Sequence, residues 1–228
     1  MTHRWEMAER RLYLCTPDRD DLASFVRSCI EGGVDVVQLR EKDADAKRIV
    51  ERAKLLARIC AELGVPFVLN DRPDLALEAG ADGVHVGQRD VSPAVARRIL
   101  GEDAIIGLST HAPREVRSSV GAPVDYVSAG PVVETPTKPG RPGTGTEYVE
   151  AAIAATERPV FVTGGVTPQS VPEIAAAGAR HFVVVRYLTR ARDPMRAAQQ
   201  LRGAIEGALT SADDRAIRGA EPQHADRN

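Results

Sequence analysis

The feature that most constrains the fold is a regular alternation of short apolar runs with longer stretches of helical periodicity. The runs are rich in Val and Ile and almost continuously apolar, which is typical of parallel strands covered on both faces. Eight such units follow one another along the chain. Strands are expected at residues 11–16, 34–39, 66–70, 83–86, 104–109, 125–130, 160–164 and 181–185. Helices are expected near residues 20–32, 45–63, 73–80, 93–100, 113–119, 147–156, 168–177 and 193–209.

Eight strands and eight helices in strict order predict an α/β fold, a single (β/α)8 TIM barrel. The reason is that a closed parallel sheet needs a crossover helix after each strand. A doubly wound open sheet is the competing architecture. The barrel is expected to occupy residues 1–210 as one catalytic domain. Residues 211–228 lose the apolar periodicity and become polar and charged, so a disordered C-terminal tail is expected there.

Charge and cysteine content exclude several classes of function. The 30 Lys and Arg residues nearly balance 32 Asp and Glu residues, so no chain-wide basic field favours nucleic acid or an acidic membrane. No apolar run approaches the roughly 20 residues that span a bilayer. Cys15, Cys29 and Cys60 lack CxxC spacing and stand in apolar segments, which predicts buried free thiols. We therefore expect a cytoplasmic protein that acts on small molecules, and a homo-oligomer is compatible with this composition.

The candidate site residues are those that follow each apolar run, because the active site of such a barrel lies at the C-terminal ends of its strands. These positions are polar with unusual regularity. In chain order they are Gln38, Arg40, Glu41, Lys42, Asn70, Asp71, Gln88, Asp90, Ser109, Thr110, His111, the 130–145 loop with Thr135, Thr137 and Lys138, then Thr163, Gly164, Gly165 and Arg186.

Asp71 and Asp90 follow the third and fourth expected strands and suggest a magnesium site. Neighbouring parallel strands lie about 4.8 Å apart, so both carboxylates can reach one cation. Mg²⁺ prefers oxygen ligands and usually takes one or two carboxylates together with phosphate oxygens of a substrate. A di- or triphosphate is thereby implied. The alternative is structural: Asp71 begins an Asx turn or caps the next helix, and Asp90 caps the one after it.

Cations and a Pro- and Gly-rich loop near these carboxylates suggest phosphate binding. Arg40 and Lys42 alternate on an extended segment and can both face the site, although such residues also occur in solvated loops. The Pro- and Gly-rich 130–145 loop offers Thr135, Thr137 and Lys138 to a phosphate. Gly164 and Gly165 either present backbone N–H groups to an anion or simply form a tight turn.

Five ordered motifs resemble those of the thiamine-phosphate synthase family: "QLREK", "LNDRPDLALEAGADGVHVGQRD", "GLSTH", "GPVVETPTKPG" and "VTGGVTPQSVPEIAAAGA". The resemblance covers residues 11–200. It implies a (β/α)8 enzyme that joins 4-amino-5-hydroxymethyl-2-methylpyrimidine diphosphate to a plain or carboxylated hydroxyethylthiazole phosphate. The products are pyrophosphate and thiamine phosphate, and the cofactor is Mg²⁺.

The resemblance also implies roles for individual residues. Asp71 and Asp90 would hold Mg²⁺, while Arg40, Lys42, Ser109 and Lys138 would be the catalytic residues. The substrate-binding residues would be Gln38, Arg40, Glu41, Lys42, Asn70, Ser109, Thr135, Thr137, Lys138, Gly165, Val185 and Arg186. The implied mechanism is a dissociative displacement that needs no dedicated nucleophile.

Two positions depart from the family pattern. Glu134 stands where an apolar residue or Pro is common, and Arg186 stands where Ser is common. Arg186 either contacts a phosphate or points outward to pair with an acid. His85 alternates with apolar strand residues and is interpreted as packing, and His111 as a cap of the next helix. Two other functions stay open: a thiazole tautomerase-like isomerase of the same barrel group, and a non-catalytic phosphate-binding barrel.

Overall fold

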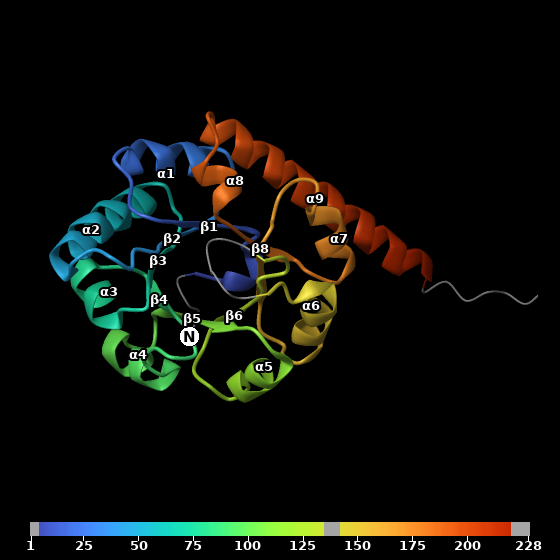
Figure 1. Cartoon of the computed structure of the whole chain (residues 1–228), viewed down its shortest axis with the longest axis horizontal. Helices are drawn as coiled ribbons and strands as arrows, with labels where there is room; N and C mark the ends of the chain where they lie inside the picture. The colour runs from blue at the N-terminus through green and yellow to red at the C-terminus, as the bar shows by residue number, and fades with distance from the viewer. Residues whose placement is uncertain (1–4, 135–141, 220–228) are drawn as a thin grey trace, which may run out of the picture.

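The eight predicted strands form one closed parallel barrel. The computed structural model describes residues 5–134 and 142–219. The strands are hydrogen-bonded in the order β1-β2-β3-β4-β5-β6-β7-β8, and β8 closes the barrel by pairing with β1. Figure 1 looks along the barrel axis and shows the helices as a ring outside the sheet. The fold prediction of a (β/α)8 TIM barrel is therefore confirmed, and the open-sheet alternative is wrong.

The elements lie close to their predicted positions. The strands are β1 (Leu12–Thr16), β2 (Val36–Leu39), β3 (Phe67–Asn70), β4 (Gly83–Val86), β5 (Ile105–Thr110), β6 (Tyr126–Ala129), β7 (Val160–Thr163) and β8 (His181–Val184). The helices are α1 (Leu22–Glu31), α2 (Ala46–Glu62), α3 (Pro73–Ala79), α4 (Pro93–Leu100), α5 (Pro113–Ser119), α6 (Gly145–Ala154), α7 (Val171–Ala176), α8 (Arg186–Thr189) and α9 (Pro194–Gly219). A 3-10 turn, η1 (Met7–Glu9), and the short α8 have no counterpart in the prediction.

The last helix corrects the predicted C-terminus. α9 continues to Gly219, whereas a helix to residue 209 and an irregular tail from 211 were expected. Polar residues do not stop a helix by themselves, and the chain contains no proline between Pro194 and Pro222 to do so. In Figure 1 the final turns of α9 project beyond the barrel, away from α1 and α7 against which its first part packs. Loss of apolar periodicity there reflects the loss of a packing partner.

Two buried layers result from the alternation of side chains along each strand. One set packs outward against the helices and forms the larger core. The other set points into the barrel and contains Tyr13, Val36, Val68, Ile105, Tyr126 and Phe161, and Met7 of η1 packs with it. The three cysteines are buried free thiols, as predicted. In the described ranges no helix is both long and apolar enough to cross a membrane.

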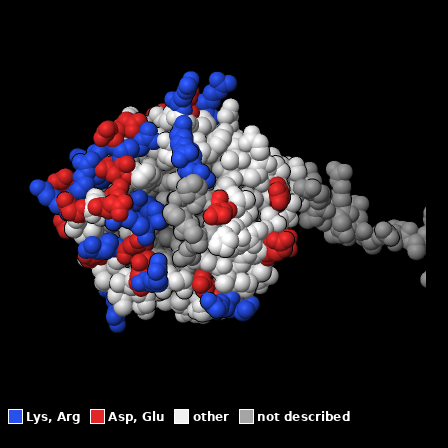
Figure 2. All heavy atoms as spheres, in the orientation of Figure 1, with Lys and Arg blue, Asp and Glu red and all other residues white. Residues whose placement is uncertain are grey.

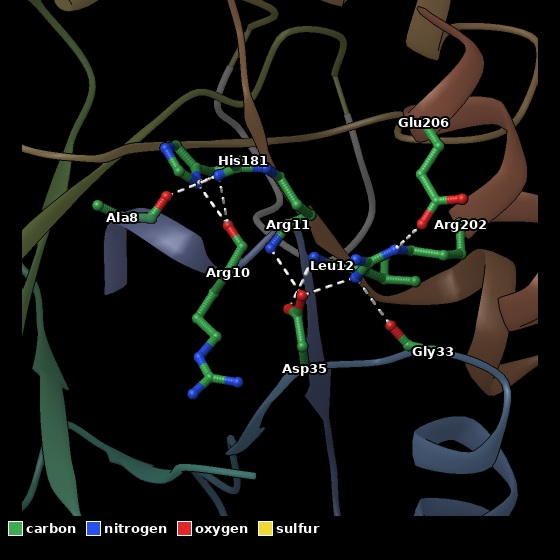
Figure 3. Close-up of polar contacts among 9 residues, drawn as sticks. All are labelled: Ala8, Arg10, Arg11, Leu12, Gly33, Asp35, His181, Arg202 and Glu206. Atoms are coloured by element: carbon green, nitrogen blue, oxygen red, sulfur yellow. Dashed lines mark hydrogen bonds and ion pairs between the residues drawn. The ribbon is translucent and has the colours of Figure 1, made fainter. Parts of the chain in front are cut away.

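The N-terminal segment closes the barrel at the end where the strands begin. Trp5 packs against the inner cluster and its indole N–H donates to Asp82, 2.8 Å away. Figure 3 shows the neighbouring junction, where Asp35 accepts the backbone N–H groups of Arg11 and Leu12 and pairs with Arg202 of α9 at 2.7 Å. These contacts leave the opposite end of the barrel as the open one.

Candidate functional site

A cavity of about 290 Å³ opens at the end of the barrel where the strands finish. It collects polar side chains from strands and loops that are far apart in the sequence. Eleven of the predicted site residues line it: Gln38, Arg40, Lys42, Asn70, Asp71, Gln88, Asp90, Ser109, His111, Thr163 and Val185. The strand register explains this gathering, because inward-facing positions at neighbouring strand ends converge on the barrel axis.

Asp71 is held at the rim by an unusual backbone conformation. Its φ is +64°, in the left-handed region that few residues other than glycine, Asn and Asp adopt. Its N–H donates to the carbonyl oxygen of His85 at 2.8 Å, which ties the end of β3 to β4. Its carboxylate lies 3.0 Å from Nζ of Lys42. The turn therefore directs the carboxylate toward the cation that follows β2.

Asp90 reaches the same place through a turn after β4. Its carboxylate accepts the N–H of Gly87 at 2.7 Å. The N-cap positions of α3 and α4 are Arg72 and Ser92, and Ser92 accepts the N–H of Val95. Helix capping by Asp71 and Asp90 is therefore wrong, which removes part of the structural alternative for the two carboxylates.

The two carboxyl groups are close enough to influence each other's ionisation. Burial raises the pKa of Asp71 above its ordinary value, Lys42 opposes that rise and Asp90 adds to it. Two close carboxylates beside a single lysine form a donor set that suits a hard divalent cation. Among the described residues no third acidic, His or Cys side chain joins them.

Two further polar side chains at the cavity, those of Asn70 and Arg40, have groups that a ligand could bind. The side-chain amide nitrogen of Asn70 is buried and has no hydrogen-bond partner in the described parts of the chain. An unpaired buried donor is costly unless a bound group satisfies it. The guanidinium of Arg40 forms no ion pair within those same parts. A ligand with acceptor oxygens and negative charge would satisfy both.

His85 faces inward and takes part in a polar network at the floor of the cavity. Its Nδ1 lies 2.9 Å from the hydroxyl of Tyr126, and its Nε2 lies 2.8 Å from Oγ of Ser109. Burial raises the pKa of Tyr126, so this hydroxyl keeps its proton. The packing interpretation of His85 therefore understated its role, because both ring nitrogens are engaged in hydrogen bonds.

His111 does not cap α5 as proposed, since the N-cap of that helix is Ala112. Its backbone N–H instead donates to Glu115 at 2.7 Å. The ring lies against the loop that follows β6, with Nδ1 2.6 Å from the carbonyl oxygen of Gly130. His111 lines the main cavity.

A second cavity of about 280 Å³ lies beside the first, between the ends of β7 and β8. Gly164, Gly165, Val185 and Arg186 line it. The two glycines have φ of +95° and +78°, a conformation that L side chains rarely adopt, so the turn itself requires glycine. Arg186 is the first residue of α8 and has no acidic partner among the described residues.

The remaining predicted residues lie elsewhere. Glu41 lines neither cavity, and its carboxylate accepts the backbone N–H groups of Asp18, Lys42 and Asp43. That carboxylate organises the β2–α2 loop. Thr135, Thr137 and Lys138 lie outside the described residues.

Charge is unevenly distributed over this end of the molecule. Figure 2 shows that charged side chains of both signs gather over α1 to α4, whereas the half over α6, α7 and α9 carries few. Lys42, Asp71 and Asp90 belong to the loops on the charged side, after β2, β3 and β4. The second cavity, between β7 and β8, lies toward the side with few charges.

Sequence reasoning missed several residues that line the main cavity. They are Tyr13, Cys15, Gly87, Arg89, Tyr126, Ser128 and Val183. Most of them lie inside strands. A two-residue period was available as a signal, because Tyr13 and Cys15 alternate with the outward-facing Leu12 and Leu14. The near-continuous apolar character of the strands obscured it.

The fold and the cavity together define a (β/α)8-barrel enzyme whose site lies at the C-terminal ends of the strands. Residues 12–188 match the family model described as thiamine monophosphate synthase. The chain belongs to the thiamine-phosphate synthase family, and the members of this family are transferases.

Individual relatives agree with this assignment. The chain is 43% identical over 220 residues to the thiamine-phosphate synthase of Mycobacterium bovis, covering 90% of this chain and 99% of the relative. It is 44% identical over 207 residues to that of Acidothermus cellulolyticus, covering 89% and 98%. A solved thiamine phosphate pyrophosphorylase from Pyrococcus furiosus superposes with a TM-score of 0.80 at 30% identity, covering 87% of this chain and 96% of the other.

Proposed function

We propose that this protein condenses 4-amino-5-hydroxymethyl-2-methylpyrimidine diphosphate with hydroxyethylthiazole phosphate, plain or carboxylated, to give thiamine phosphate and pyrophosphate with Mg²⁺. Membership of the family supports the reaction class. The observation that carries the finer proposal is one cavity in which Lys42 and Arg40 stand beside the paired carboxyls of Asp71 and Asp90. Such a rim can bind a diphosphate together with a divalent cation.

The proposed poses follow the two cavities. The diphosphate contacts Arg40 and Lys42 and accepts a hydrogen bond from the unpaired N–H of Asn70. The pyrimidine ring lies deeper in the cavity, against Gln38 and Ser109. The thiazole phosphate occupies the second cavity, beside Gly165, Val185 and Arg186. In this proposal Thr135, Thr137 and Lys138 contribute from the loop after β6, Thr135 and Thr137 to the thiazole phosphate and Lys138 to the diphosphate.

Asp71 and Asp90 would hold the Mg²⁺, whose contribution is to neutralise the negative charge that builds up on the departing pyrophosphate. A cation held by these residues would also offset the repulsion between the two carboxylates. Lys42 contributes a second positive charge next to Asp71, at 3.0 Å.

The proposed reaction is a dissociative displacement. The bond between the pyrimidine methylene carbon and the diphosphate oxygen breaks, and its electron pair leaves with pyrophosphate. The electron-rich aminopyrimidine spreads the resulting positive charge, and the thiazole nitrogen then forms the new bond to the methylene carbon. The side chains of Arg40, Lys42, Lys138 and Ser109 orient the reactants and stabilise charge, so no protein nucleophile is needed.

Two further parts of the proposal concern the cellular compartment and the oligomeric state. Three buried free thiols suit a reducing compartment, and we propose the cytoplasm. A homo-oligomer stays a prediction. An isomerase or a silent phosphate-binding barrel would have no use for a metal-assisted release of pyrophosphate, so that release separates the proposed transferase from both alternatives.

The test is the substitution Asp71→Asn, with Asp74→Asn as its matched control. Asp74 is three residues further along, exposed, and pairs with Arg72 away from the cavity. Thiamine phosphate is measured by the fluorescence of its oxidised product. Asp71→Asn is expected to lower turnover by at least about 100-fold, because one of two metal carboxylates is lost. Full turnover in Asp71→Asn would contradict the proposal.

A further inference from the structure

A third cavity, of about 300 Å³, lies beside the two substrate cavities at the ends of β1 and β8. Three of its lining residues are arginines, Arg40, Arg186 and Arg190, and none of the described residues that line it is acidic. Arg40 also lines the main cavity, Arg186 also lines the second, and Val185 lines all three. The third cavity therefore shares walls with both substrate cavities. Of the three cavities, Arg190 lines only this one.

The three arginines reach the cavity from two parts of the fold. Arg40 directly follows β2, and its backbone N–H donates to the carbonyl oxygen of Thr16 at 2.8 Å, which places it beside the end of β1. Arg186 and Arg190 are separated by the single turn of α8, where the N–H of Arg190 donates to the carbonyl oxygen of Arg186 at 3.1 Å. Residues four apart lie on the same face of a helix, so both side chains project from one side of α8.

The charges of these arginines are not balanced by acids of the protein. None of the three guanidinium groups forms an ion pair within the described parts of the chain. Figure 2 shows basic side chains over α8. A neighbouring hollow, which shares Pro17 and Thr189 with the cavity, contains Asp20 and Asp21, and Asp21 pairs with Arg19 at 3.0 Å. Like charges one helical turn apart repel each other, and a cleft lined by one sign of charge attracts counter-ions.

The backbone that carries Arg186 and Arg190 is held in place from outside the cavity. Arg19 donates to the carbonyl oxygen of Thr189 at 3.2 Å, which joins the loop after β1 to the end of α8. Leu188 of α8 is fully buried in the larger core. An anion that enters the cavity therefore has to order only side chains and not the backbone, which lowers the cost of binding.

The position of the third cavity relative to the acidic pair limits how it can bind an anion. Asp71 and Asp90 follow β3 and β4 and line the main cavity, whereas the third cavity lies at β1 and β8 and contains neither carboxylate. Arginine binds phosphoryl oxygens through paired N–H donors and needs no metal ion to do so. A phosphoryl anion in this cavity would be bound by guanidinium groups alone.

We propose that the third cavity is a metal-independent site for pyrophosphate, which holds the released product on its way out of the main cavity. The proposal rests on the proposed function, since that reaction supplies pyrophosphate. Arg40 lines both cavities and can keep contact with the anion as the anion moves away from Asp71 and Asp90. Arg186 and Arg190 then supply two further positive charges.

The experiment measures binding of inorganic pyrophosphate by calorimetry in the presence of a chelator, so that no divalent cation takes part. Binding requires no turnover, so failure of this proposal is distinguishable from failure of the proposed reaction. Arg190→Ala is expected to weaken metal-free binding by roughly 10-fold, because a charge-assisted contact is lost. Arg190→Glu is expected to weaken it further, because repulsion replaces that contact. The Arg190 side chain is exposed, so both variants are expected to fold.

Arg192→Ala is the matched control, since Arg192 is also exposed, lies two residues further along and does not line the cavity. It should change the affinity for pyrophosphate by less than about 2-fold. Equal affinities in Arg190→Ala and Arg192→Ala would place the anion in the substrate cavities and overturn the proposal. Absence of metal-free binding to the unsubstituted protein would also overturn it.

A second source of negative charge is the carboxylated thiazole phosphate, whose carboxylate could reach this cavity from the second one past Arg186. The two sources are separated by measuring binding of the plain and the carboxylated thiazole phosphate to Arg190→Ala. The proposal predicts similar changes for both forms. A loss of affinity confined to the carboxylated form, with metal-free pyrophosphate binding unchanged, would assign the cavity to the substrate carboxylate and overturn the proposal.

Discussion

Nζ of Lys42 lies 3.0 Å from Oδ2 of Asp71 at the rim of the main cavity. The lysine side chain is 50% exposed and the aspartate 24%, so the pair is only partly shielded from water. A pair of this kind contributes little to stability, about 0 to 1 kcal/mol. Ligand binding therefore explains the position of the Lys42–Asp71 pair better than a contribution to folding stability does.

The first prediction concerns Lys42→Met. Removing this cation is expected to lower kcat for thiamine phosphate formation by roughly 100-fold, because a charge stabilising the departing pyrophosphate is lost. The free energy of unfolding should change by less than about 1 kcal/mol. Lys54→Met is the control, since Lys54 pairs with Glu78 on the helical surface at 3.6 Å. Equal turnover in the two variants would show that Lys42 does not act on the reaction.

A second prediction compares two glycines. In Gly107→Ala the new Cβ would lie 2.2 Å from the ring of Tyr126, so the interior must shift and the free energy of unfolding should fall by about 1–3 kcal/mol or more. Gly203→Ala, within α9, meets nothing within 4 Å and should raise stability by about 0.5–1 kcal/mol. Chemical denaturation checks both. Similar values for the two variants would contradict the described packing.

The third prediction is a pH dependence of stability that originates at His181. Its ring lies at the closed end of the barrel, 4.9 Å from that of Phe161, with Nδ1 against the carbonyl oxygen of Arg10 (Figure 3). Burial lowers the pKa of His181 to about 4, and the nearby charges of Arg11 and Arg180 act in the same direction. The bond to Arg10 opposes that shift. His181 is therefore neutral in the folded protein at pH 7.

Between pH 6.5 and 4 the unfolded chain binds a proton at His181 that the folded chain does not bind. Stability from this group is complete above pH 6.5 and is lost as the pH falls toward 4, by at most about 3 kcal/mol. Denaturant unfolding at several pH values measures it. In His181→Gln the free energy of unfolding should fall by about that much less between pH 7.5 and pH 4. Each protein is compared with its own value at pH 7.5, so that a change in packing caused by the substitution does not enter the comparison. An identical decline in both proteins would show that His181 is not the source.

A fourth prediction concerns Arg186, which lines the second cavity and has no acidic partner among the described residues. Arg186→Ala is expected to raise KM for the thiazole phosphate by roughly 10-fold, because a charge-assisted contact to phosphate is lost. KM for the pyrimidine diphosphate should change by less than about 2-fold, because in the proposed pose the pyrimidine diphosphate does not contact Arg186. Arg192→Ala, an exposed position beyond α8, is the control. A rise in both KM values would place Arg186 at the diphosphate instead.

Periodicity predicted the barrel well because each of its eight units carries its own local signals. Strand and helix boundaries agree with the structure to within three residues, α9 excepted. η1 and α8 were missed because elements of three and four residues are too short to show a period. The end of α9 was missed because a helix can continue without an apolar face once it has begun.

The sequence predicted the cavity residues that come directly after a strand, but not most of those that lie inside a strand. Asp71 and Asp90 come after apolar runs, so their convergence follows from the parallel order of the strands. Tyr13 and Tyr126 stand inside apolar runs, and only the closed barrel shows that they face the axis and join Gln38 to His85. Glu41 lines neither cavity because its carboxylate accepts backbone N–H groups of its own and a neighbouring loop, and periodicity does not show the path of a loop.

The most direct test of the proposed reaction is to incubate the purified protein with both phosphorylated substrates and to measure pyrophosphate and thiamine phosphate together. The measurement is made with Mg²⁺ and again with a chelator. The account predicts one pyrophosphate for each thiamine phosphate, and formation of both only when Mg²⁺ is present. Absence of both products with Mg²⁺ present, or undiminished formation with the chelator, would contradict it.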